Sequence, residues 1–266
     1  MVKNFEQKLR SISLNSEKRS MTPSYYDDKS TSKDFYTDLD RAKSAIERRY
    51  GDPLDPKSID FKQRKSYMGD GKINVVNGFP INPYRLANAP KGRGILAKWG
   101  PNFAADPLIT RIDRDTGELK VLVIQREDTG HWAFPGGMVD FGEKVTTTAL
   151  RELGEEAVSD ESLDLIKDQL LDIGSIIYEG YADDPRNTQN AWMETAIFHM
   201  HLTPDIEGSL QLEYDEQETL GVKWLSFNDV SSMNNLYGSH SDYIQMALSR
   251  LIDSGVVMLE EYLEYF

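Results

Sequence analysis

The sequence has no cysteine among its 266 residues. That absence excludes disulfide bonds, thiolate metal sites and a cysteine nucleophile. It also has no run of about eighteen apolar residues, so the sequence offers no candidate transmembrane helix. The chain is long enough for one large domain, or a domain with an appendage, and can bury a core of its own.

Basic residues are outnumbered, with 30 Lys and Arg against 44 Asp and Glu and a formal net charge of −14. A nucleic-acid-binding protein normally presents a basic face, so this balance argues against that partner. Solubility is the simplest interpretation of the charge. We therefore expect neither nucleic acid nor a membrane as partner, and the sequence does not indicate an oligomeric state.

Residues 1–70 are rich in Ser, Lys and Asp and poor in β-branched residues, which predicts a polar N-terminal extension or cap. A modest helical period runs through residues 36–51. The first residues mix basic and apolar side chains as transit peptides do, but their acidic residues argue against one. We expect an intracellular protein, in the cytoplasm first and the mitochondrion as the alternative.

Residues 71–266 have the pattern of a mixed α and β domain. Strands are expected over 107–113, 119–127, 173–181, 190–202 and 220–227. Helices are expected over 145–157, 159–172 and 239–255, the second capped by Ser159 or Ser162. Because these elements have no regular βαβ rhythm, the pattern favours an α+β domain on a mixed sheet over a Rossmann fold.

The stretch from Phe134 to Ala157 combines a glycine turn with the first of these helices. At 100° per residue, the apolar residues share one arc that would face the core: Ala149, Leu150, Leu153 and Ala157. Three carboxylates project from a second arc: Glu152, Glu155 and Glu156.

Carboxylates this close raise each other's pKa unless a cation lies among them. Mg²⁺ and Mn²⁺ prefer oxygen ligands, and Mg²⁺ commonly takes one or two carboxylates together with substrate phosphates. Gly136 and Gly137 permit a close backbone approach before the helix, and Arg151 is placed to pair with Glu143. The simpler alternative is a solvated acidic face, which the glycine turn at a fixed distance disfavours.

The spacing of this stretch resembles the Nudix box: Gly137, five residues, Glu143, seven residues, then Arg151-Glu152-Leu153-x-Glu155-Glu156. The resemblance implies an α/β/α sandwich around a mixed β-sheet, and hydrolysis of a nucleoside diphosphate linked to another group. It implies a catalytic set in which Glu152, Glu155 and Glu156 bind Mg²⁺, or Mn²⁺ as the alternative. Glu143 and Arg151 would hold the loop against the helix.

A second stretch, Tyr178 to Thr195, is dense in hydrogen-bonding groups. Arg186 offers a planar guanidinium for phosphate, and Tyr181 and Trp192 are candidates for stacking on a base. With the two glycines of the turn, the candidate substrate-binding residues are Gly136, Gly137, Asp183, Asp184, Arg186, Asn187 and Asn190. The alternative is a plain surface loop with an Asp-Pro turn.

This second stretch is similar to the corresponding segment of the mitochondrial-type ADP-ribose pyrophosphatases, and to the ADP-ribose-sensing domain of melastatin-type TRP channels. The resemblance covers roughly residues 80–250 and implies hydrolysis of ADP-ribose to AMP and ribose 5-phosphate. The general base would be Glu152, Glu156 or an acid of the later loop: Asp215, Glu216 or Glu218. Two alternatives stay open, an ADP-ribose sensor with little turnover and a Nudix hydrolase of another nucleoside diphosphate derivative.

The histidines have simpler interpretations. His199 and His201 alternate along a strand and share a face, which predicts a hydrogen-bonded or exposed pair rather than a metal site. His240 begins a helix, where Ser239 or Ser241 is the expected cap.

Overall fold

The computed structural model describes residues 51–140, 142–216, 219–229 and 235–258. The helix expected over residues 36–51 therefore lies outside the described residues, apart from its last position. No helix in these ranges has the length and apolar character needed to cross a bilayer.

Seven strands of the described residues form one mixed sheet, with the path β5-β4-β3-β8-β7, β6 paired to β3 and β9 paired to β4. Their bounds are β3 Gly100–Ile112, β4 Leu119–Arg126, β5 Trp132–Ala133, β6 Gly137–Met138, β7 Ser175–Tyr181, β8 Ala191–His201 and β9 Thr219–Ser226. The pair β3 and β8 is parallel, and the other pairs are antiparallel. The mixed sheet expected from the sequence is thus present.

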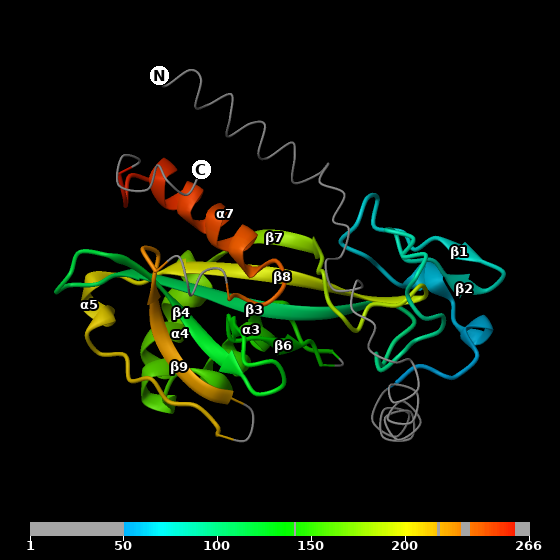
Figure 1. The fold of residues 1–266 in the computed structure, drawn as a ribbon, viewed down its shortest axis with the longest axis horizontal. Helices are drawn as coiled ribbons and strands as arrows, with labels where there is room; N and C mark the ends of the chain where they lie inside the picture. The colour runs from blue at the N-terminus through cyan, green and yellow to red at the C-terminus, as the bar shows by residue number, and fades with distance from the viewer. Residues whose placement is uncertain (1–50, 141, 217–218, 230–234, 259–266) are drawn as a thin grey trace, which may run out of the picture.

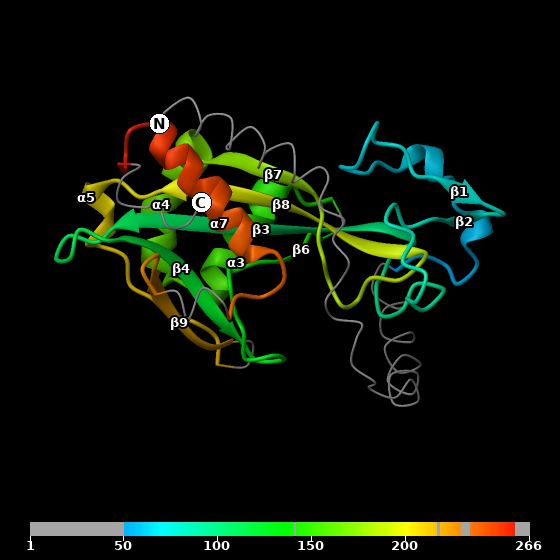
Figure 2. The ribbon, with the colours of Figure 1, turned by 45° about the horizontal axis from the view of Figure 1, so that its top comes forward.

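Helices cover both faces of this sheet (Figures 1 and 2). Their bounds are α3 Val145–Glu156, α4 Asp160–Ile173, α5 Pro204–Glu207 and α7 His240–Asp253. Neighbouring residues of β3 point to opposite faces: Leu108 packs in the cluster that α7 covers, and Ile109 in the cluster that α3 and α4 cover. This is the expected α/β/α sandwich.

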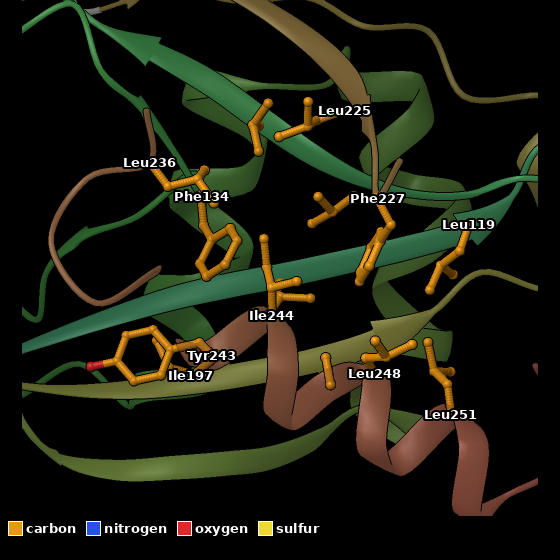
Figure 3. Close-up of a cluster of buried hydrophobic side chains, with 14 of the residues drawn as sticks. Leu119, Phe134, Ile197, Leu225, Phe227, Leu236, Tyr243, Ile244, Leu248 and Leu251 are labelled. Carbon is orange, nitrogen blue, oxygen red and sulfur yellow. The ribbon is translucent and has the colours of Figure 1, made fainter. Parts of the chain in front are cut away.

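The cluster under α7 is drawn in Figure 3, where Ile244, Leu248 and Leu251 point from the helix toward strand residues such as Ile197. Each of these side chains is almost fully buried. Burial of one such side chain contributes roughly 1.5–3 kcal/mol relative to exposure. Helix α7 is therefore fixed on the sheet.

Helix α4 begins at the cap that the sequence predicted. The Ser159 hydroxyl accepts a hydrogen bond from the Ser162 amide at 3.3 Å. By contrast, strand β3 is longer than expected, because residues 100–106 pair in parallel with residues 191–197 of β8. The expected histidine pair is hydrogen-bonded, since Thr110 Oγ1 lies 2.9 Å from His199 and 3.0 Å from His201.

Residues 51–99 form a loop-rich lobe at the far ends of β3 and β8 (Figure 1). It contains the 3₁₀ turns η2 Pro56–Ser58 and η3 Phe61–Gln63 and the hairpin β1 Val75–Val76 with β2 Phe79–Pro80. The buried Glu194 carboxylate of β8 accepts hydrogen bonds from Ser66 Oγ at 2.6 Å and the Tyr67 amide at 2.5 Å. The division of the chain at residue 70 stays a prediction.

Candidate active site

Helix α3 is anchored by its apolar face, since Ala149 and Leu153 are completely buried. The helix has no side-chain cap at Lys144. Instead Thr148 Oγ1 donates to the Glu143 carboxylate at 2.8 Å, which ties the preceding loop to the first turn. The acidic arc predicted from the sequence therefore has a rigid base.

Arg151 links the loop to the helix, as the sequence predicted. Its guanidinium donates to Glu143 at 3.2 Å, to Glu152 at 2.7 Å and to Glu155 at 2.9 Å. The hydrogen bond from Arg151 lowers the pKa of Glu143, and the reciprocal contact with Glu143 raises the pKa of Arg151. Both groups stay charged at neutral pH.

The glycine turn fits closely against two carboxylates. A Cβ atom at Gly136 would lie 2.0 Å from Asp106 Oδ1, and one at Gly137 would lie 2.2 Å from Glu152 Oε1. The Gly136 amide also donates to Glu156 Oε2 at 2.8 Å. A side chain at either position would therefore displace a carboxylate of the site.

These groups line one cavity of about 280 Å³. Its acidic lining residues are Asp106, Glu152, Glu156, Asp183 and Asp184, and its two lining arginines, Arg126 and Arg186, form what is called the basic wall below. The other lining residues include the rings and apolar side chains of Ala104, Phe134, Met138, Met193, Tyr237, His240 and Tyr243. The cavity thus combines opposite charges with surface suited to a ring.

Each arginine of the basic wall is oriented by its own aspartate. Arg186 donates to Asp184 at 2.8 and 2.7 Å, and Arg126 donates to Asp128 at 2.9 and 2.7 Å. Burial opposes the charge of Arg186, but the hydrogen bonds to Asp184 outweigh it and raise the pKa. The Arg126 guanidinium also lies 4.5 Å above the Tyr237 ring.

Burial raises the pKa of Asp106 to about 7, with the hydrogen bond from Thr195 opposing this shift and the charge of Glu152 adding to it. Asp106 Oδ2 accepts that bond from Thr195 Oγ1 at 2.5 Å. Asp106 lies inside β3 but outside the strand expected over 107–113, so the sequence did not indicate it.

The serine cap expected at the start of α7 is wrong, and the neutral His240 ring is held in one orientation instead. Ser239 makes no side-chain capping bond. Instead His240 Nδ1 accepts from the Phe134 amide at 3.0 Å, and the two rings stack at 4.4 Å. Burial, helped by Arg126, lowers the pKa of His240 to about 3. Because Nδ1 is an acceptor, the proton of the neutral ring is on Nε2.

Part of the second stretch lies away from the cavity. Asn187 Nδ2 donates to Tyr181 Oη and the Ala182 carbonyl, and Asn190 Nδ2 donates to the Pro80 carbonyl. Both asparagines are buried, and neither lines the cavity. The stacking role expected for Tyr181 and Trp192 is wrong, because both rings are buried, at 4% and 2% exposure, outside the cavity.

Two of the three expected metal ligands face the cavity. Glu152 and Glu156 line it, whereas Glu155 does not, and its side chain is 50% exposed beside Arg151. Within the described ranges, no three acidic or histidine side chains meet at metal-binding separation. The donor set of carboxylate oxygens nonetheless fits a hard divalent cation, with Glu152 and Glu156 as its holders.

In the described part of the later loop, neither candidate base reaches the cavity. Asp215 and Glu216 are exposed and do not line it. Glu218 lies outside the described residues. Asp106, Arg126 and Tyr237 line the cavity but were not predicted as site residues, although all three lie within the stretch 80–250 that resembles the ADP-ribose pyrophosphatases.

Known proteins resemble this chain over residues that form the cavity. A family model described as the NUDIX domain matches residues 105–246. A Caenorhabditis elegans protein named nudix hydrolase 6 is 41% identical over 194 residues, covering 71% of each chain. The mitochondrial ADP-ribose pyrophosphatase of Rattus norvegicus is 40% identical over 210 residues, covering 71% of this chain and 58% of that enzyme.

A third relative belongs to a much longer protein. The transient receptor potential cation channel subfamily M member-like 2 of Nematostella vectensis is 40% identical over 200 residues, which are 68% of this chain and 12% of the channel. The similarity therefore extends across two kinds of protein.

Proposed function

The chain belongs to the Nudix family, and from that premise we propose that it hydrolyses ADP-ribose to AMP and ribose 5-phosphate. One observation carries the proposal: Glu152 and Glu156 line the same cavity as Arg126 and Arg186. A diphosphate is the group that such a lining fits, because it meets arginines directly and carboxylates through a cation. The name of the rat relative supplies the substrate.

Nudix hydrolases use divalent metal ions, and we propose Mg²⁺, with Mn²⁺ as the alternative. Glu152 and Glu156 would hold the ion. When bound, it would neutralise phosphate charge and lower the pKa of water. Glu155 accepts a hydrogen bond from Arg151 at 2.9 Å. It would join the other two ligands only after that bond breaks.

The protein's own groups then have separate tasks. Arg126 and Arg186 bind phosphate oxygens, and the Tyr237 ring, which lines the same cavity, is the proposed contact for the adenine. Hydrolysis forms one bond from the water oxygen to phosphorus and breaks one bridging P–O bond. A cavity carboxylate accepts the proton of the water. Arg151 and Glu143 keep helix α3 and the glycine turn in register throughout.

The sensor alternative rests on the similarity to the channel. Hydrolysis of ADP-ribose is better supported than sensing alone, because helix α3 keeps both cavity glutamates and the Arg151–Glu143 pair. A Nudix hydrolase for another nucleoside diphosphate derivative is the second alternative. It differs from the proposal only in which group occupies the cavity beyond the diphosphate.

The test is a panel of nucleoside diphosphate compounds and triphosphates, each incubated with the full chain and Mg²⁺, with products identified by mass spectrometry. The proposal expects ADP-ribose to have the highest kcat/KM and to yield AMP and ribose 5-phosphate. Binding of ADP-ribose without product would establish the sensor, and preference for another compound would reassign the substrate. Microscopy of the tagged full chain would separate the cytoplasm from the mitochondrion as its compartment.

A further inference from the structure

The loop that carries Asp184 and Arg186 is held from outside the sandwich by the lobe of residues 51–99. Thr188 Oγ1 donates to the Gly92 carbonyl at 2.6 Å. The Gln189 amide donates to the Pro90 carbonyl at 3.0 Å. The substrate side of this loop faces the cavity, while its return segment, residues 188–190, is bonded to the lobe.

Asn82 is the lobe residue that reaches both ends of this loop, and it has no exposed surface. Its Nδ2 donates to the Thr188 carbonyl at 2.9 Å and to Tyr181 Oη at 3.3 Å. The main-chain amide of Asn82 donates to the Gln189 carbonyl at 2.9 Å, and its side-chain Oδ1 accepts from the main-chain amide of Tyr84 at 2.9 Å. Every polar group of the side chain is therefore used.

The Tyr181 hydroxyl links Asn82 to Asn187, a residue of the loop. This hydroxyl also accepts from Asn187 Nδ2 at 3.0 Å. Asn187 in turn accepts from the Met193 amide at 2.7 Å and donates to the Ala182 carbonyl at 2.8 Å, which closes the base of the loop. Asn82 thus fixes the two segments between which Arg186 projects.

We propose that Asn82 is a positioning residue: through Tyr181 and Thr188 it sets the loop so that Arg186 meets the substrate's phosphates. The inference rests on the proposed function for the identity of that substrate. The hydrogen bonds of Asn82 end on residues that flank the Arg186 loop, Tyr181, Thr188 and Gln189, or stay within the lobe, and none of them reaches Glu152 or Glu156. Loss of Asn82 therefore weakens substrate binding and leaves metal binding unchanged.

The first test is Asn82→Ala in the full chain, with Ser66→Ala as the matched control. Ser66 bonds the same lobe to Glu194 at 2.6 Å but makes no bond to the loop. Asn82→Ala should raise KM for ADP-ribose about tenfold to a hundredfold, the scale of a misplaced binding group. The value of kcat and the half-saturating Mg²⁺ concentration should stay within about twofold. Ser66→Ala should leave KM unchanged.

Two further variants keep the proposal open to refutation if Asn82→Ala does not fold. A Cβ atom at Gly94 would lie 2.8 Å from Thr188 Cγ2, so Gly94→Ala presses on the same loop. Gly117 is the matched control, because its φ is +72° and that of Gly94 is +58°, and a Cβ atom added at Gly117 would have no atom within 4 Å. Gly94→Ala should raise KM, and Gly117→Ala should not.

The mode of action is tested by a double-mutant cycle. If Asn82 acts through Arg186, Asn82→Ala adds nothing to the KM of Arg186→Ala, whereas an independent structural effect would multiply it. Hydrogen exchange of amides 182–190, measured without substrate, should quicken in Asn82→Ala and not in Ser66→Ala. A folded Asn82→Ala variant with normal exchange and normal KM would overturn the proposal. Absent turnover in the wild type, with the exchange difference intact, would instead refute the proposed function.

Discussion

Replacement of Gly137 by alanine tests the fit between the glycine turn and helix α3. The new Cβ atom would lie 2.2 Å from Glu152 Oε1 and 2.5 Å from its Cδ. Ordinary van der Waals contact requires the carboxylate to retreat by about 1 Å. Arg151 holds the same carboxylate by a 2.7 Å ion pair, and the Glu152 side chain is only 9% exposed. The carboxylate therefore has little room to yield.

The expected effect on catalysis is large and the effect on folding is small. A misplacement of about 1 Å at a reacting centre costs about a hundredfold in rate, or about 2.7 kcal/mol of transition-state stabilisation. Gly137 does not have a positive φ, so alanine strains no backbone there. The same displacement should weaken divalent metal affinity, because Glu152 is a proposed ligand.

The assay combines steady-state kinetics with ADP-ribose and a Mn²⁺ titration followed by electron paramagnetic resonance. Gly221→Ala is the matched control, since Gly221 lies in β9 with open space around its Cβ position and no positive φ. The control should behave as the wild type in both measurements. A folded Gly137→Ala variant with unchanged kcat/KM and unchanged Mn²⁺ affinity would show that the glycine turn does not set the position of Glu152.

Three other perturbations have defined outcomes. Arg186→Ala should raise KM for ADP-ribose about tenfold or more, and it should lower the unfolding midpoint because the buried Asp184 loses its ion-pair partner. Arg114→Ala, at an exposed turn, should leave KM unchanged. Equal KM values for the two variants would remove Arg186 from the site. Tyr237→Ala should raise KM more for ADP-ribose than for ribose-linked diphosphates that lack a base, and an equal loss for both would exclude stacking. Burial lowers the pKa of His199 and His240 to about 3, so the unfolded chain binds more protons between about pH 3 and 6.5, and stability falls as pH falls through that window. The drop from pH 7 to 5 should be about 2 kcal/mol per histidine by urea unfolding, and a flat profile would contradict it.

The local parts of the site were predictable from sequence. The period of Ala149 and Leu153 sets one face of α3, and the eight-residue interval between Glu143 and Arg151 sets their ion pair. The Ser159 cap is likewise a contact over three residues. Each depends on geometry within one or two turns of chain, which the spacing of residue types determines.

The rest of the cavity depends on contacts that sequence spacing does not encode. Asp106, Arg126 and Tyr237 come from β3, the end of β4 and the segment before α7, and they meet only through the pairing of the sheet. Asn187 and Asn190 were predicted to bind substrate because polar loop residues suit that role. They instead bond the main chain of their own loop and of the lobe, a difference that composition alone does not reveal.

The central claim is that glutamates of α3 hold a divalent cation that hydrolysis of the diphosphate requires. Its most direct test measures ADP-ribose turnover after EDTA treatment and again after Mg²⁺ is restored, in the wild type and in Glu156→Gln. We expect no turnover in EDTA, full recovery of wild-type turnover with Mg²⁺, and almost no turnover in the variant despite retained ADP-ribose binding. Turnover in EDTA, or a Glu156→Gln variant as active as the wild type, would contradict it.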